Sequence, residues 1–255
     1  MRNCIVLILA LSITKICVAQ KTVTNQALTW FTFNQNLKIN DRFSVQTDIQ
    51  ERFFIAPLKQ SQFLIRSTFK TAIKQNWDFG VGFCFFLTNT DPTVNFHLQV
   101  PEVRPYIEFN NKQVLKRIVV SHRYRLESRF FKNSNNNELQ HGFSFGSMRF
   151  RYQLGVDILL NKPKDEKHAI KLRASNEIML NFGNKIKYNL FDQNRLSVAL
   201  QYAPIKSVAF EIGYVNWFQQ RASGSAYFNR NILRIGIISN IHLNKKKNQS
   251  IQQNN

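Results

Sequence analysis

The chain has 255 residues and a formal charge of +20, because 35 basic side chains outnumber 15 acidic ones. This length suits one large domain, and no apolar run after the N-terminal segment is long enough for a transmembrane helix. Cys84 is the only cysteine beyond residue 20, which excludes a disulfide within a mature chain.

Residues 1–19 have the pattern of a secretory signal peptide. Arg2 provides a positive start, Ile5 to Ile13 form an apolar core, and Cys17-Val18-Ala19 resembles a cleavage site. A lipoprotein acylated at Cys17 is the alternative, although Lys15 lies unfavourably close for that processing. We therefore predict export and removal of residues 1–19.

Export changes which partners the positive charge would attract. Loss of Arg2 and Lys15 with the signal peptide leaves a formal charge of +18 on the mature chain. A basic cytosolic protein would suggest a nucleic-acid partner, whereas an exported one meets lipid phosphates, lipopolysaccharide, acidic glycans or anionic solutes. We expect no nucleic-acid partner, and no motif indicates a cofactor.

Polar and apolar residues alternate along most of the mature chain, as in strands whose successive side chains point to opposite faces. We predict about eleven strands, near residues 27–38, 41–54, 61–74, 76–88, 102–110, 114–131, 141–160, 167–182, 192–204, 206–219 and 229–244. A closed antiparallel sheet in one bacterial chain takes an even number, so ten or twelve strands are expected. The polar residues 245–255 are predicted to be a disordered tail.

The predicted connections alternate in length along the chain. Short ones are expected at residues 40–41, 110–113, 162–166 and 204–206, and longer ones at 88–101, 132–140, 183–190 and 220–228. Short turns at one end and long loops at the other are typical of outer-membrane barrels. The predicted fold class is all-β: a closed antiparallel transmembrane β-barrel formed by residues 20–244.

The segment Ser121–Phe130 (SHRYRLESRF) indicates which face of such a barrel would be charged. Its alternation separates three arginines and Glu127 from Tyr124, Leu126 and Phe130. A basic residue facing lipid at the bilayer midplane costs about 2–4 kcal/mol. Three of them would offset most of a total stability of about 5–15 kcal/mol, so the charged face is predicted to line the lumen.

Strand parity extends this face to twelve charged side chains: Arg123, Arg125, Glu127, Arg129, Arg149, Arg151, Asp157, Lys171, Arg173, Glu177, Arg195 and Glu211. Eight of them are basic, so the predicted lumen is basic. One interpretation is structural, an internal ion-pair lattice that fills a narrow barrel. The other is a narrow pore or ligand cavity that favours anions.

Several segments together resemble an uncharacterised Bacteroidota outer-membrane barrel family that is known only as a domain of unknown function. They are HRYRLESRF (122–130), RFRYQL (149–154), FDQNRLSVALQY (191–202), EIGYVN (211–216), and ERF (51–53) after Trp30. The resemblance covers about residues 24–244. It implies an outer-membrane β-barrel and no activity, so no catalytic residue follows from it.

Signals for catalysis are weak. His141, Ser144 and Ser147 could be read as a lipid hydrolase pair, but His141 and Ser144 would point to opposite faces of a regular strand. Ser147 would lie about 20 Å from His141 along an extended strand. The five histidines show no metal-ligand spacing, and Cys84 has no basic neighbour in sequence to activate it. We therefore predict a protein that is not an enzyme.

The functional prediction is a narrow pore or solute-binding barrel in the outer membrane. The signal peptide would export the chain and then be cleaved off. An outer-membrane lipid-acting enzyme and a soluble periplasmic barrel that binds an acidic or apolar ligand are the alternatives. Lys132, Arg221 and Arg230 flank connections expected outside the cell. They could form charge-assisted hydrogen bonds to the phosphates of lipopolysaccharide.

Overall fold

The computed structural model describes residues 21–91, 97–135, 137–161, 167–183, 186, 190–221 and 223–243. The predicted signal peptide, the predicted tail and the predicted turn at 162–166 lie outside the described residues. The strands are β1 (Thr22–Lys38), β2 (Phe43–Phe54), β3 (Lys59–Lys74), β4 (Trp77–Asn89), β5 (Gln99–Leu115), β6 (Ile118–Asn135), β7 (Glu138–Leu159), β8 (Ala169–Phe182), β9 (Phe191–Ile205), β10 (Val208–Gln220) and β11 (Ala226–His242).

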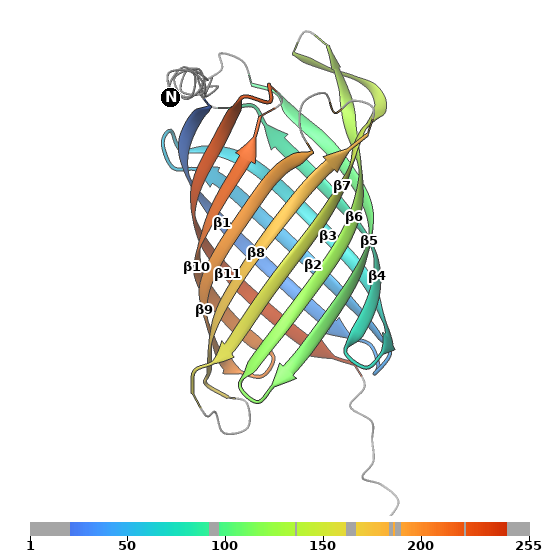
Figure 1. The fold of residues 1–255 in the computed structure, drawn as a ribbon, viewed down its shortest axis with the longest axis vertical. Coiled ribbons are helices and arrows are strands. Elements are labelled where there is room, and N and C mark those ends of the chain that lie inside the picture. Colours follow the sequence, from blue (N-terminus) through green and yellow to red (C-terminus); the bar gives the residue numbers. More distant parts are fainter. Residues whose placement is uncertain are drawn as a thin grey trace, which may run out of the picture.

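These eleven strands of the described chain close into one barrel, in which each strand pairs with its neighbours in sequence (Figure 1). The predicted all-β closed barrel is confirmed, but the predicted number of ten or twelve strands is wrong. Because each connection reverses the chain, an odd number of strands leaves β1 and β11 running the same way. They close the barrel as a parallel pair, with Thr22 opposite Ala226 and Lys38 opposite His242. A parallel ladder also satisfies the backbone groups of both edge strands.

The barrel has two different ends. We call the upper end the one that carries the β2–β3, β4–β5, β6–β7, β8–β9 and β10–β11 connections, and the lower end the opposite one. β1 begins at the upper end (Figure 1) and β11 finishes at the lower end. Tight turns join β3 to β4, β5 to β6 and β9 to β10 at the lower end.

Two predicted connections are wrong because polar residues occupy strands. Residues 110–113 continue β5, and the turn follows at Lys116, which has a positive φ of 50°. Asn110 faces the interior, where its Nδ2 donates to Asp78 Oδ1 at 2.7 Å and to Glu108 Oε1 at 3.0 Å. A polar interior therefore accepts residues that resemble a turn in sequence.

The predicted loop at 132–140 is largely a hairpin. β6 continues to Asn135 and β7 begins at Glu138, and these two residues pair with each other. Asn137 lies in the turn with a φ of 64°, a left-handed conformation that asparagine tolerates. The β6–β7 arm therefore extends beyond the upper end of the barrel (Figure 1).

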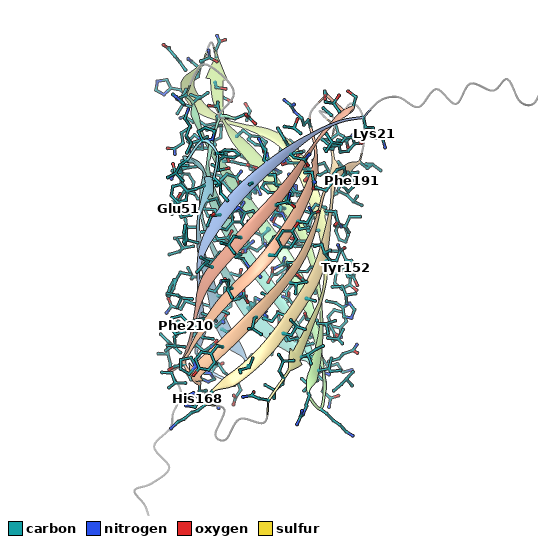
Figure 2. The ribbon with its side chains drawn as sticks, turned by 90° about the vertical axis from the view of Figure 1, so that its left-hand side faces the viewer. Lys21, Glu51, Tyr152, His168, Phe191 and Phe210 are labelled. Carbon is teal, nitrogen blue, oxygen red and sulfur yellow. The ribbon has the colours of Figure 1, made fainter. Side chains whose placement is uncertain are left out.

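The outer surface of the wall is apolar. On β9, Leu196, Val198, Leu200 and Tyr202 are 41–51% exposed, whereas the intervening Ala199 is 3% exposed. Figure 2 shows side chains such as that of Phe210 projecting away from the wall. This is the reverse of a soluble barrel, in which the apolar residues fill the interior. No helix among the described residues is long and apolar enough to cross a membrane.

The interior is mainly polar, with two small apolar clusters. One consists of Leu28, Trp30, Phe54, Val215, Trp217 and Ile232, and the other of Leu64, Cys84, Phe86 and Tyr106. Gly82 makes room for Tyr106, because a Cβ at Gly82 would lie 2.3 Å from Tyr106 Cζ. These clusters leave most of the interior to charged side chains.

Candidate functional site

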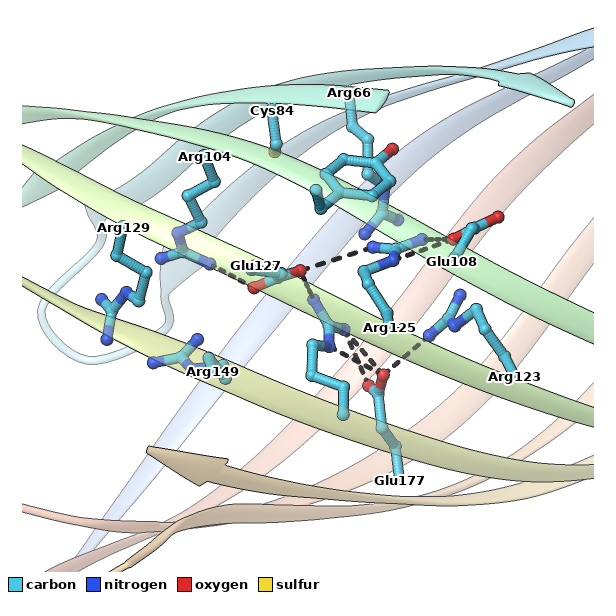
Figure 3. Close-up of polar contacts among 12 residues, drawn as sticks. Arg66, Cys84, Arg104, Glu108, Arg123, Arg125, Glu127, Arg129, Arg149 and Glu177 are labelled. Carbon is cyan, nitrogen blue, oxygen red and sulfur yellow. Dashed lines mark hydrogen bonds and ion pairs between the residues drawn. The ribbon is translucent and has the colours of Figure 1, made fainter. Parts of the chain in front are cut away.

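Charged side chains from neighbouring strands form a continuous ion-pair network inside the barrel (Figure 3). Glu127 of β6 lies at its centre and is 2% exposed. Arg151 Nη1 of β7 lies 2.6 Å from Glu127 Oε1. Arg125 Nη1 and Arg104 Nη1 lie 3.5 Å and 3.8 Å from carboxylate oxygens of Glu127. One carboxylate thus serves arginines from three strands.

Three further glutamates extend this network, each joining basic side chains from different strands. Glu177 joins Arg151 (2.8 Å) and Arg123 (2.7 Å), Glu108 joins Arg125 (2.5 Å) and Lys70 (3.1 Å), and Glu102 joins Arg104 (2.6 Å) and Arg129 (2.6 Å). The ten members comprise six bases and four acids, so the network retains positive charge.

Separate pairs line the rest of the wall. Arg66 pairs with Asp48, and Arg149 with Asp192 at 2.8 Å, while Glu211 joins Arg173 and Arg234, both at 2.9 Å, and Asp157 binds Arg173 at 3.1 Å. Breaking a buried pair such as Arg149–Asp192 by removing one partner costs about 3–5 kcal/mol, whereas the side chains of Arg173 and Asp157 are 38% and 35% exposed and their pair contributes less. These contacts therefore hold the strands in register.

Three interior arginines have no carboxylate within 4.0 Å among the described residues, namely Arg52, Arg195 and Arg230. Each donates to the Oε1 of a glutamine, whose amide then donates to a carboxylate. We call these arrangements the glutamine relays. They are Arg52–Gln50–Asp48 (2.5 and 2.9 Å), Arg195–Gln193–Asp192 (2.8 and 2.8 Å) and Arg230–Gln26–Asp91 (2.7 and 2.9 Å).

The relays leave two arginines without a counter-ion of their own. Asp48 pairs directly with Arg66, and Asp192 with Arg149. The interposed glutamines orient Arg52 and Arg195 but carry no charge to neutralise them.

Two tryptophans accompany these arginines. The rings of Trp30 and Trp217 meet edge to face, with centroids 5.8 Å apart. Arg52 Cζ lies 3.9 Å from the Trp30 ring centroid, and Arg195 Cζ lies 4.5 Å from that of Trp217. Trp30 Nε1, Trp217 Nε1 and Arg195 Nε are buried donors without an acceptor in the described protein.

Two interior cavities meet beside Arg52 and Arg195, which contact the tryptophans. The upper cavity, about 440 Å³, is lined by six arginines against the two carboxylates Asp91 and Glu102. The lower cavity, about 310 Å³, is lined by nine arginines against four carboxylates. Four arginines border both cavities, namely Arg52, Arg104, Arg149 and Arg195, and we call them the arginine layer. A third hollow of about 710 Å³ shares Arg129, Phe131 and Gln219 with the upper cavity and lies at the upper rim.

The comparisons with known proteins identify a family. Residues 27–229 match the family described as Protein of unknown function (DUF2490). The chain belongs to this family. A solved structure of the NanC porin in a rhombohedral crystal form is similar over 79% of this chain and 88% of that one, with 13% sequence identity and a TM-score of 0.49. No curated protein matches significantly.

In this DUF2490 barrel, all twelve residues of the predicted charged face lie on interior strand positions. Eleven of them take part in the contacts described above. Lys171 lies on the same face as Arg173, but it borders none of the three hollows.

Sequence analysis missed the partners on β2, β3 and β5, and also Asp192 of β9 and Arg234 of β11. Glu102, Arg104 and Glu108 alternate with Val103, Pro105, Ile107 and Phe109, the same pattern that was recognised on β6. Parity alone could have found them. The glutamine relays carried no such signal, because a glutamine on a strand is unremarkable until its two partners are known.

The three residues predicted to meet lipopolysaccharide have different positions. Lys132 Nζ lies 5.4 Å from the Phe143 ring centroid, and the exposed Arg221 has its Cζ 4.7 Å from that of Phe228. Arg230 is 9% exposed and lines the upper cavity. This inward-pointing strand position argues against contact between Arg230 and lipopolysaccharide.

Among the described residues, no hydrogen bond joins the side chain of His141 to Ser144 or Ser147. Ser144 Oγ donates to Asn133 Oδ1 at 2.6 Å, and Asn133 Nδ2 donates to the backbone oxygen of His141 at 2.7 Å. Ser147 is 5% exposed, whereas His141 is exposed. Cys84 is buried in the apolar cluster around Tyr106. Among the described residues, no group of three or more His, Cys, Asp or Glu side chains could hold a metal ion.

Proposed function

We propose that this protein is an outer-membrane barrel that conducts or binds small anions through its arginine-lined lumen. The observation that carries this function is the arginine layer between the upper and lower cavities. An internal lattice that served only to fill the barrel would be expected to pair its charges. Here eleven arginines line the two cavities, against six lining carboxylates and two further ones, Glu127 and Asp192, that pair with lining arginines.

Membrane insertion is supported by the outer surface. The exposed Leu196, Val198, Leu200 and Tyr202 of β9 have counterparts on β10, where Phe210, Ile212 and Tyr214 are 49–55% exposed. Water would solvate such a continuous apolar wall poorly, whereas hydrocarbon favours it. The backbone requirement of a membrane span is also met, because the closed sheet leaves no unpaired edge.

Anion preference follows from the lumen charge. Charges of one sign between low-dielectric walls focus the field and raise the local concentration of counter-ions. A solute that passes between the cavities must cross the arginine layer. Anions would therefore be favoured and cations repelled at that level.

Reversal potentials in planar bilayers would test this function. The full-length mature protein should conduct, and under a KCl gradient its reversal potential should shift toward that of chloride. Replacing Arg52 and Arg195 by Gln should reduce this shift, while Lys171→Gln, which removes one lumen charge away from the cavities, should reduce it less. Cation preference would overturn the proposal. Absence of both conductance and anion binding would mean that the lattice only fills the barrel.

The two alternative functions predict different experimental results. A soluble periplasmic barrel should remain monomeric in solution without detergent after cell fractionation. A lipid-acting enzyme that uses His141 should lose hydrolysis in His141→Ala. Extraction from membranes only by detergent, without lipid hydrolysis, is the outcome expected from the proposed function.

A further inference from the structure

We infer that Arg52, Arg195, Trp30 and Trp217 form a specific binding site for a small oxyanion, meaning a carboxylate, sulfate or phosphate group, at the middle of the barrel. This inference rests on the proposed anion route and adds to it a defined site and ligand chemistry. We call these four residues the mid-barrel site.

The charge balance of the mid-barrel site requires an external anion. Arg52 is 3% exposed, and a buried charge without a counter-ion is strongly disfavoured. The carboxylates nearest in the relays, Asp48 and Asp192, are already paired with Arg66 and Arg149. A dianion such as sulfate between Arg52 and Arg195 would neutralise both charges, and a carboxylate would neutralise one of them.

Among the described residues, the unpaired hydrogen-bonding atoms of the mid-barrel site are all donors. Trp30 Nε1, Trp217 Nε1 and Arg195 Nε are donors that lack an acceptor among the described residues. The acceptors that touch the two arginines are already in use: Gln50 Oε1 and Gln62 Oε1 accept from Arg52, and Gln193 Oε1 accepts from Arg195. A water molecule must donate as well as accept, whereas an oxyanion only accepts. A set of donors alone therefore favours an oxyanion over water.

The space and the attachment of Arg195 allow such a ligand to enter. Among the described residues, the guanidinium of Arg195 makes one hydrogen bond, from Nη2 to Gln193 Oε1 at 2.8 Å, and it borders both cavities. Trp30 lines the lower cavity and Trp217 the upper one, so a modest shift of Arg195, which lines both, would open the buried N–H groups toward the junction of the two cavities. The upper cavity, about 440 Å³, has room for the remainder of a small organic acid.

The tryptophans provide a direct readout. The chain has three tryptophans, and the third, Trp77, is 41% exposed at the lower end. In a Trp77→Phe background the indole fluorescence of the full-length mature protein in detergent comes only from the mid-barrel site. Sodium benzoate, sodium sulfate and sodium phosphate are the probes, with sodium chloride at matched ionic strength as the reference.

We expect at least one oxyanion to change this fluorescence saturably, while chloride does so weakly. Arg195→Gln and, independently, Arg52→Gln should weaken the apparent affinity roughly tenfold or more, as expected for loss of a charge-assisted hydrogen bond. Lys171→Gln is the matched control and should bind like the parent. Saturation by benzoate alone identifies a carboxylate ligand, and saturation by sulfate or phosphate a tetrahedral one.

Two results would overturn the mid-barrel site. One is the absence of saturable change with every probe, and the other is equal weakening by Lys171→Gln and the two arginine variants. Anion-selective conductance without saturable binding would refute the site and keep the pore. Saturable binding without conductance would refute the pore and keep the site. Heat-modifiability on gels identifies variants that fail to fold, and the two arginine variants provide independent tests.

Discussion

Arg151 of β7 and Glu127 of β6 pair diagonally across adjacent strands, with Arg151 Nη1 2.6 Å from Glu127 Oε1, although Arg149 lies directly opposite Glu127 in the ladder. Arg151 also binds Glu177 of β8, so one guanidinium connects three consecutive strands. Glu127 in turn touches Arg125 and Arg104. Loss of Glu127 would leave six bases against three acids in this buried network.

Glu127→Gln should therefore destabilise the barrel substantially. Glu127 is 2% exposed, so the cost should approach that of a broken buried pair, about 3–5 kcal/mol, rather than the about 0–1 kcal/mol of an exposed one. Heat-modifiability on a gel in detergent should show unfolding at a lower temperature than for the parent. Ser128→Ala, on the opposite face, is the control and should change little. Equal behaviour of Glu127→Gln and the parent would mean that water replaces the carboxylate easily.

Gly82→Ala should destabilise the barrel by overpacking. A Cβ at this position would meet the Tyr106 ring at 2.3 Å, and Tyr106 is fixed by a 2.6 Å hydrogen bond to Thr68 Oγ1. Overpacking a filled core costs about 1–3 kcal/mol. Gly155→Ala is the matched control, because its Cβ would meet only the rotatable Ser121 Oγ closely. Thermal unfolding followed by circular dichroism should rank Gly82→Ala well below Gly155→Ala, and the reverse order would contradict the packing described.

Parallel closure of the barrel predicts a specific cross-link. Asn36 and Asn240 are opposite each other in the β1–β11 ladder, and their side-chain amides are joined at 2.9 Å. In a Cys84→Ala background, Asn36→Cys with Asn240→Cys should form a disulfide on mild oxidation, visible as a mobility shift on a non-reducing gel. Asn25→Cys with Asn240→Cys places the thiols near opposite ends of the same seam and should not cross-link. Failure of the first pair would argue against a barrel closed by β1 and β11.

Lipid contact is expected at the upper rim but not inside the barrel. Lys132 and Arg221 lie on the β6 arm and after β10, where lipopolysaccharide phosphates could reach them. The double variant Lys132→Gln with Arg221→Gln should carry less co-purified lipopolysaccharide in native mass spectrometry. Arg230→Gln removes a charge of the same kind from the interior and should retain the parent amount. Unchanged lipopolysaccharide in the double variant would reject this contact.

The sequence by itself determined the architecture of the wall and the side of it that is charged. Alternation along a strand is a local property, so it can be recognised in the sequence without any knowledge of neighbouring strands. The energetic cost of an arginine in hydrocarbon then decides which face points inward. The interior positions of Arg125, Glu127 and Arg151 follow from these two arguments alone.

Only the tertiary structure decided the number of strands and the identity of each charge's partner. Strand count depends on how β1 and β11 meet, a contact between residues about two hundred positions apart. The pairing of Arg195 with Gln193, rather than with a carboxylate, depends on strand register and on which arginine already occupies Asp192. Register and closure are properties of several strands at once, and for this reason alternation within each strand could not reveal the glutamine relays or the mid-barrel site.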